Sequence, residues 1–287
     1  MAKLLEGAPV AEALTRQIKE GVDRLRRFGP VPTLAILRVG ERPADLSYEK
    51  QTRRQCESVG IRVKQFLLPE NSPRQELLDA VEAINRDPGV HGCLLFRPLA
   101  DKDTERAACA LLAPEKDVDG VGVGALGAVF AGEGAGFPPC TAQACMEVLD
   151  YYQIPIAGKR AAVIGRSLVV GRPVSMLLQQ RDATVTICHS KTRDLPGICR
   201  EADILIAAAG QMGMVTADFL RPGQVVLDVG IHREGGKLRG DVDFPAADAA
   251  AEAVTPVPGG VGRVTSAVLT RHVFEAAAGV SLQRQQP

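Results

Sequence analysis

The first half of the chain alternates between two apolar periods, one typical of strands and one typical of helices. An apolar residue recurs every three or four positions from Val10 to Leu25, which predicts an amphipathic helix over residues 8–28. Further elements are expected in the order strand 33–39, helix 46–59, strand 61–68, helix 73–84, strand 90–96 and helix 105–112. This β-α-β-α-β order predicts parallel strands with right-handed crossovers, whose carboxyl ends face a common crevice.

The second half repeats the alternation and predicts a second, mostly parallel sheet. Its expected elements are helix 140–153, strand 160–164, helix 170–180, strand 183–188, helix 194–201, strands 203–209 and 224–229, and helix 265–278. The whole pattern indicates an α/β protein of two domains, each with a mostly parallel sheet flanked by helices.

Two stretches break the alternation, and each leaves two interpretations open. The passage 122–136, rich in glycine and alanine, is typical of a mobile linker or of a bed for a flat ligand. Residues 254–262 contain two prolines and three glycines, which excludes the interior of a sheet. That segment is either a hinge or a surface on which the backbone lies close to a ligand.

The segment from Arg160 to Gln180 predicts a strand, a tight turn and a helix. Gly165 permits the sharp turn, and Gly171 lets the new helix pack close to the sheet. The first N–H groups of the helix and the positive end of its dipole then suit an anionic phosphate. The match to G-x-G-x-x-G is imperfect, because Ser167 takes the place of the middle glycine and the spacing to Gly171 is one residue longer. Turns of this type also occur without a ligand.

The end of the next strand points to NADP as the cofactor. The strand 183–188 continues into His-Ser-Lys-Thr-Arg, without the acidic residue that accepts from the ribose 2′-hydroxyl in proteins that prefer NAD. The hydroxyl of Ser190 and the cation of Lys191 would instead accommodate a 2′-phosphate. Arg166 is placed for a forked contact to the same phosphate.

Composition excludes several classes of function. The chain has 287 residues, 46% of them hydrophobic, and balances 34 basic against 34 acidic side chains. A neutral chain gives no reason to expect nucleic acid or an anionic membrane surface as a partner. No apolar run is long enough to span a membrane, and the first residues lack the apolar segment of a secretory signal. These features favour a cytosolic metabolic protein.

The cysteines and histidines do not indicate a metal site. Seven cysteines are scattered along the chain without a Cys-x-x-Cys motif, and there are only four histidines. The closest pair, Cys140 and Cys145, has no histidine nearby in the sequence, so buried reduced thiols are expected there. We therefore expect no metal.

Four motifs together resemble the methylenetetrahydrofolate dehydrogenase/cyclohydrolase (FolD) family, and the likeness covers nearly the whole chain. They are Pro114-Glu115-Lys116-Asp117-Val118-Asp119-Gly120, Gly165-Arg166-Ser167 with Val170-Gly171-Arg172-Pro173, Cys188-His189-Ser190-Lys191-Thr192, and Thr255-Pro256-Val257-Pro258-Gly259-Gly260-Val261-Gly262. The resemblance implies a folate-binding catalytic domain over 1–139 and 267–287 and a Rossmann-type NADP-binding domain over 140–266. It also implies a folate cleft between the two domains and a homodimer.

The resemblance implies a role for individual residues. Tyr48 would lie against the pterin and aminobenzoyl region of the folate, and Asp119 would accept hydrogen bonds from the amino-pyrimidine edge of the pterin. Without the family context, Tyr48 is an ordinary tyrosine and Asp119 an aspartate in a turn before glycine. The segment Pro258-Gly259-Gly260 would close over the same ligand. The positions that match NADP contacts are Gly165, Arg166, Ser167, Ser190 and Ile231.

Two departures from the family bear on its catalytic residues. Bifunctional members carry a lysine four residues after the tyrosine and a glutamine before a later Leu-Pro, and here these positions are Thr52 and Phe96. Hydride transfer from the methylene bridge needs alignment and no proton abstraction, whereas hydrolysis of the methenyl cation needs a positioned acid or base. Threonine and phenylalanine cannot act as that acid or base. His232 also stands where asparagine is common, and Arg263-Val264 where Pro-Met is usual.

These observations predict an NADP-dependent methylenetetrahydrofolate dehydrogenase whose cyclohydrolase activity is weak or absent. Three alternatives stay open. The chain could be a fully bifunctional dehydrogenase/cyclohydrolase, a non-catalytic paralogue that binds folate or NADP, or a related dehydrogenase that acts on another small substrate.

Overall fold

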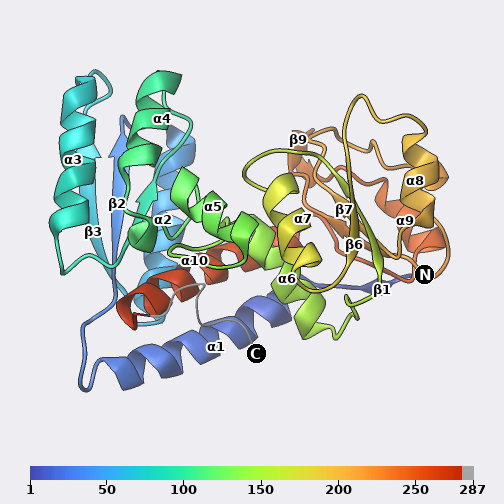
Figure 1. Cartoon of the computed structure of the whole chain (residues 1–287), viewed down its shortest axis with the longest axis horizontal. Helices are drawn as coiled ribbons and strands as arrows, with labels where there is room; N and C mark the ends of the chain where they lie inside the picture. The colour runs from blue at the N-terminus through green and yellow to red at the C-terminus, as the bar shows by residue number, and fades with distance from the viewer. Residues whose placement is uncertain (280–287) are drawn as a thin grey trace. The chain divides into compact units, whose positions relative to one another are not determined.

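The computed structural model describes residues 1–279 and divides the chain into two units, each built on its own sheet (Figure 1). The unit with three strands contains Ala13–Cys140 and the chain from Ser266 onward. The unit with six strands contains Met1–Glu12 and Thr141–Thr265. Residues 280–287, which close the catalytic domain expected from the sequence, lie outside the described residues. The α/β class with mostly parallel sheets is confirmed.

The three-stranded unit is centred on β2 (Thr33–Val39), which pairs in parallel with β3 (Arg62–Leu68) on one side and β4 (Gly92–Leu95) on the other. Leu34 to Leu37 of β2 are fully buried, as a central strand covered on both faces requires. On one face, Ala35 and Leu37 pack in a cluster with Leu77 and Val81 of α3 (Arg74–Arg86) and with residues of α4 (Lys102–Leu111). The expected β-α-β-α-β order is confirmed.

Helix α2 (Pro43–Ser58) buries an unusual face, because the buried residues at its one-turn spacing are largely polar. Glu49 of this helix accepts from Arg38 of β2 at 2.7 Å, and both side chains are almost fully buried. Pairing both charges compensates for their desolvation. Since Thr52 and Cys56 extend the same buried row, this ion pair fixes which residues of α2 turn inward.

The glycine-rich passage 122–136 contains a helix, α5 (Val123–Ala131), and is not simply a linker. Its residues Ala125, Ala128 and Val129 have small apolar side chains and are buried. Gly132 ends the helix in the left-handed conformation, with φ of 77°, which glycine adopts without strain. The short 3-10 helix η1 (Pro114–Lys116) precedes this passage.

The six-stranded unit has the strand order β1-β11-β8-β7-β5-β6, and every neighbouring pair is parallel. Four strands match the sequence prediction: β5 (Arg160–Ile164), β6 (Thr184–Cys188), β7 (Ile204–Ala207) and β8 (Val225–Asp228). Two-residue strands that were not predicted, β1 (Lys3–Leu4) and β11 (Ala253–Val254), extend the sheet. The helices α7 (Gly171–Gln179), α8 (Leu195–Glu201) and α9 (Phe244–Ala250) belong to the same unit.

Further elements lie outside this sheet or contribute residues to both units. An antiparallel hairpin of β9 (His232–Glu234) and β10 (Lys237–Arg239) follows β8 and was not predicted. Helices α1 (Gly7–Leu25) and α10 (Val261–Ala277) have residues in both units, and α6 (Cys140–Tyr151) starts at a boundary. No helix within residues 1–279 is both long enough and apolar enough to cross a membrane.

Candidate functional site

The three-stranded unit brings together Tyr48, Thr52 and Phe96, three of the predicted site residues. Tyr48 and Thr52 lie one turn apart on α2, and their side chains are hydrogen-bonded. Phe96 follows β4, and its ring centroid lies 5.5 Å from that of Tyr48 at an interplanar angle of 54°. Tyr48 is 37% exposed, whereas Thr52 and Phe96 are only 2% and 4% exposed. Tyr48 is therefore partly open to solvent, whereas the threonine and the phenylalanine beside it are almost fully covered.

Asp119 belongs to the same cluster. Burial raises the pKa of its carboxyl to about 6, although the nearby Arg97 guanidinium acts in the opposite direction. The two groups approach to 3.8 Å between Arg97 Nη2 and Asp119 Oδ2. Burial, followed by the negative charge of Asp119, also raises the pKa of the Tyr48 phenol above its usual range. Near neutral pH the site therefore contains a neutral phenol, a carboxylate and a guanidinium.

Neighbouring backbone interactions hold the loop that carries Asp119. The carboxylate of Asp117 accepts from the backbone N–H of Val121 at 3.1 Å and of Gly122 at 2.7 Å. Gly120 has φ of 67°, and a Cβ there would come within 2.6 Å of the Phe137 carbonyl oxygen. Only glycine fits this position without strain, so the predicted Asp-Gly turn has a steric reason.

A buried histidine that the sequence analysis did not select supports this loop from α10. His272 Nδ1 donates to the carbonyl oxygen of Val118 at 2.9 Å, and the thiol of Cys140 donates to the same oxygen at 3.2 Å. The imidazole stacks on Phe137 with centroids 4.8 Å apart. Burial lowers the pKa of His272 to about 4. The expectation of buried reduced thiols at Cys140 and Cys145 is confirmed, but the fold does bring a histidine beside Cys140.

The predicted phosphate turn lies between β5 and α7 of the six-stranded unit. Gly165 has φ of 125°, and a Cβ there would overlap the carbonyl oxygen of Ala208. A Cβ on Gly171 would overlap the carbonyl oxygen of Gly165, so this glycine does let the helix begin against the turn. Ser167 accepts from the backbone N–H of Val170 at 3.1 Å. Arg166 and Ser167 are exposed.

The other predicted cofactor positions follow strands of the same sheet. Because Ile164 of β5 pairs with Cys188 of β6, the turn at Gly165 and the segment with Ser190 share the carboxyl edge. Ile231, which is 63% exposed, comes after β8 at that edge. The first acidic residue after β6, Asp194, caps α8 by accepting from Gly197. The sheet thus presents exposed hydroxyl and cationic side chains, with no carboxylate directly after β6.

A network of two buried carboxylates next to this edge was missed by the sequence analysis. Asp241 is fully buried and accepts from His232 Nε2 at 2.7 Å and from the backbone N–H of Gly210 at 2.9 Å. Asp228 accepts from the backbone N–H of Asp241 at 2.9 Å, and burial raises the pKa of its carboxyl to about 6. A cavity of about 470 Å³ adjoins Asp228 and Gly240. Asp241 thereby connects the loops that follow β7 and β8.

The predicted ligand-covering segment belongs to the six-stranded unit. The carbonyl oxygen of Gly259 accepts from the backbone N–H of Gly7 at 2.7 Å. A Cβ on Gly260 would come within 2.6 Å of the Pro256 carbonyl oxygen. Thr255, which precedes the segment, accepts from the backbone N–H of Asp228 at 2.7 Å. Pro258, Gly259 and Gly260 thus form a tightly built loop, and their contact with folate stays a prediction.

The parallel six-stranded sheet and its glycine turn define an α/β protein of the dinucleotide-binding class. Residues 5–119 match the model of "Tetrahydrofolate dehydrogenase/cyclohydrolase, catalytic domain", and residues 139–280 match that of "Tetrahydrofolate dehydrogenase/cyclohydrolase, NAD(P)-binding domain". The chain belongs to the tetrahydrofolate dehydrogenase/cyclohydrolase family.

Individual relatives agree with this assignment. The chain is 48% identical over 279 residues to the bifunctional protein FolD of Carboxydothermus hydrogenoformans, covering 96% of this chain and 97% of the relative. The crystal structure of the bifunctional enzyme FolD from Campylobacter jejuni superposes with a TM-score of 0.93 at 37% identity, covering 97% and 99% of the two chains. The FolD of Trypanosoma brucei, solved with NADP cofactor and an inhibitor, has a TM-score of 0.89 at 34% identity, covering 97% and 98%.

Proposed function

We propose that the protein oxidises 5,10-methylenetetrahydrofolate to 5,10-methenyltetrahydrofolate with NADP, and that its cyclohydrolase activity is weak or absent. The observation that carries the second part is the pair Thr52 and Phe96. These two side chains are buried beside Tyr48, and the resemblance to bifunctional members implies a lysine and a glutamine at their positions. Family membership carries the first part.

The residues on the six-stranded sheet fit NADP. Gly165 and Gly171 keep the turn between β5 and α7 free of side chains, so a pyrophosphate can approach its backbone. Exposed Arg166, Ser190 and Lys191 would hold the 2′-phosphate, since a guanidinium, a hydroxyl and an ammonium all donate to it. The bound cofactor supplies a nicotinamide ring that accepts hydride. The NADP-bound relative supports this choice.

The three-stranded unit contains residues that can bind and align the substrate for dehydrogenation. The open ring of Tyr48 offers a face for stacking, and Asp119 offers two acceptor oxygens for the adjacent donors of an amino-pyrimidine. Hydride leaves the methylene carbon with a push from the nitrogen lone pair, so alignment is sufficient and no side chain has to move a proton.

Hydrolysis of the methenyl cation makes a different demand on the same residues. Water must lose a proton and a ring nitrogen must gain one, and a positioned acid or base typically contributes roughly 10²–10⁴-fold to such a step. Thr52 does not titrate near neutral pH, Phe96 has no polar atom, and the phenol of Tyr48 has a raised pKa. These properties support a slow second step.

A fully bifunctional enzyme is the second candidate. It is favoured by the relative that is 48% identical over almost the whole chain and is named a bifunctional protein FolD. The two candidates differ only in the rate of methenyl hydrolysis, because both include the dehydrogenase reaction.

Separate assays of the two half-reactions test the proposal. We expect the protein to reduce NADP with methylenetetrahydrofolate, and to open the methenyl ring little faster than buffer does. The double variant Thr52→Lys/Phe96→Gln is expected to gain hydrolysis, whereas the matched variant Thr52→Val is expected to gain none. Hydrolysis by the unmodified protein at the rate of its dehydrogenase reaction would refute the loss of cyclohydrolase. NADP binding without any reduction would refute the enzyme itself and favour the non-catalytic alternative.

A further inference from the structure

Arg97 is a charged residue of the folate site to which nothing above assigns a role. It follows Phe96 directly, after the end of β4, and its side chain approaches Asp119. Its side chain is 24% exposed, close to the 27% of Asp119. Among the residues discussed in the Tyr48 cluster it contributes the positive charge, where bifunctional members have the leucine of a Leu-Pro pair.

The guanidinium is close to Asp119 but does not use its donors there. The separation of 3.8 Å between Nη2 and Oδ2 is an ion-pair distance and too long for a hydrogen bond. Nε of Arg97 is buried and has no acceptor among residues 1–279. A ligand acceptor would meet the exposed part of this side chain and not the covered Nε, and a guanidinium without a hydrogen-bond acceptor there favours such a ligand. The site therefore offers donors and acceptors side by side.

A 2-amino-4-oxo-pyrimidine has the complementary edge. Its 2-amino group and N3–H are donors that suit the Asp119 carboxylate, and its 4-oxo oxygen is an acceptor next to N3. Arg97 also opposes the burial that raises the pKa of Asp119, so it favours the ionised, purely accepting form of that carboxyl. The exposed face of Tyr48 then covers a flat ring.

We propose that Arg97 is a specificity-determining residue of the pterin site, and that its guanidinium donates to the 4-oxo oxygen while Asp119 accepts from N3–H and the 2-amino group. This inference rests on the proposed function, since it concerns the substrate of the same site. It predicts that the protein distinguishes 4-oxo from 4-amino pterins in a way that depends on the charge at position 97. A 4-amino group presents a donor to the donors of Arg97.

The test compares folic acid with aminopterin, its 4-amino analogue, by equilibrium binding to the full chain. The dissociation constant of aminopterin divided by that of folic acid is expected to fall roughly tenfold or more in Arg97→Leu. The reason is that only folic acid loses a hydrogen bond to a charged group. Some preference should remain, since the analogue also lacks the N3–H that Asp119 needs. Arg97→Lys, which keeps a cationic donor, is expected to retain part of the difference.

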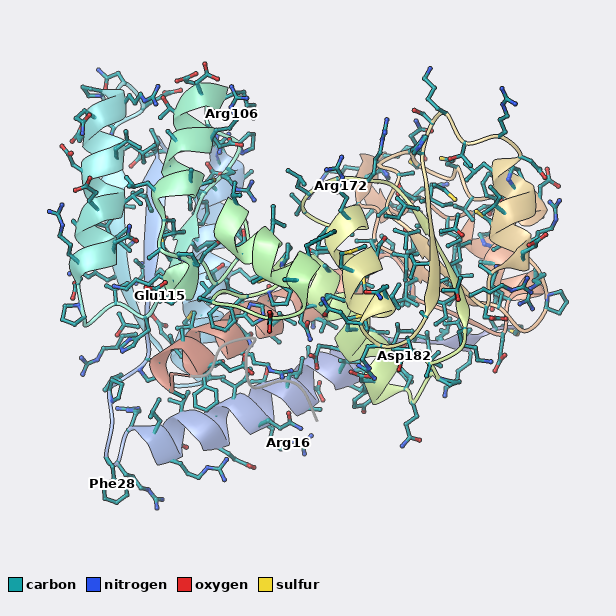
Figure 2. The ribbon with its side chains drawn as sticks, in the orientation of Figure 1. Arg16, Phe28, Arg106, Glu115, Arg172 and Asp182 are labelled. Atoms are coloured by element: carbon teal, nitrogen blue, oxygen red, sulfur yellow. The ribbon has the colours of Figure 1, made fainter. Side chains whose placement is uncertain are left out.

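The matched control is Arg106→Leu. Arg106 lies on α4 (Figure 2), and its side chain is 79% exposed and paired with Asp103, so its loss should leave the ratio unchanged. A purely structural role of Arg97 would weaken both ligands equally and leave the ratio as it is, and that result overturns the inference. If Arg97→Leu does not fold, the ratio in Arg97→Lys decides, and an unchanged ratio there overturns it as well. If the unmodified protein oxidises methylenetetrahydrofolate and the ratio of the dissociation constants does not change in the Arg97 variants, this inference alone is refuted. If the unmodified protein binds neither pterin, the proposed function is refuted as well.

Discussion

Protonation of His272 provides the sharpest test of how α10 supports the loop that carries Asp119. The imidazole is 2% exposed, and burial lowers its pKa from 6.5 to about 4. A histidine whose folded pKa is depressed adds stability above its unfolded pKa, and that stability is lost as the pH falls toward the folded value. The difference between these two pKa values corresponds to about 3 kcal/mol of unfolding free energy, all of it lost between about pH 6.5 and pH 4.

Other buried groups respond to acid with the opposite sign, so a variant has to isolate the contribution of His272. The pKa of Asp119 and of Asp228 is raised to about 6 in the fold, so their protonation below pH 6 favours the folded state. His272→Asn removes the titration and keeps an N–H donor near the position of Nδ1, facing the carbonyl oxygen of Val118. The difference between the unmodified protein and this variant then cancels the carboxyl contributions.

Urea denaturation followed by circular dichroism gives the measurement, because the chain has no tryptophan to report by fluorescence. From pH 7.5 to pH 4 the unmodified protein is expected to lose about 3 kcal/mol more stability than His272→Asn. If the two curves of stability against pH run parallel, then His272 is not held neutral by burial. The contacts of His272 with Phe137 and Val118 would then not make the stability of the fold depend on pH.

Two further predictions concern the six-stranded unit. Gly171→Ala is expected to raise the KM for NADP about tenfold or more, because its Cβ would overlap the carbonyl oxygen of Gly165 and displace the turn. Gly127→Ala in α5 has no atom within 4 Å of the new Cβ and should leave that KM unchanged. His232→Ala is expected to destabilise the protein by about 1–3 kcal/mol in urea titrations and to raise the KM for NADP, since the buried Oδ1 of Asp241 loses its hydrogen bond from His232. His232→Asn should restore most of the loss, and equal effects of both substitutions would contradict the role of the hydrogen bond.

Local patterns were sufficient for most of the fold. The run Thr33–Val39 is mostly apolar and forms the central strand with the bounds expected, and Arg160–Ile164 also forms a strand with the bounds expected. Strands of two residues cannot be read from a pattern, because β1 and β11 exist only through pairing with chain that is distant in sequence. The homodimer depends on contacts between two copies of the chain, and the folate cleft depends on how the two units are placed. Both stay predictions.

The role of a site residue could be predicted only where it depends on residues that are close to it in the sequence. Gly165 and Gly171 occupy a strand, turn and helix that are continuous in sequence, so their steric roles could be inferred directly. His272 and Asp241 act on residues that lie 154 and 31 positions away, Val118 and Gly210. No local signal marks such partners, and the family resemblance had pointed to the loop of Asp119 without naming what supports it.

Thr52 and Phe96 have to be considered together, because the resemblance to bifunctional members implies a lysine and a glutamine at these two positions. Position 52 is 2% exposed, so a lysine there would be desolvated and would need a polar partner to stay charged. Phe96 packs against Tyr48 and offers no such partner, and a glutamine at position 96 without the lysine would leave a buried amide unsatisfied. Each single substitution, Thr52→Lys or Phe96→Gln, is therefore expected to be unfavourable. For this reason we expect methenyl hydrolysis to appear only in the double variant Thr52→Lys/Phe96→Gln.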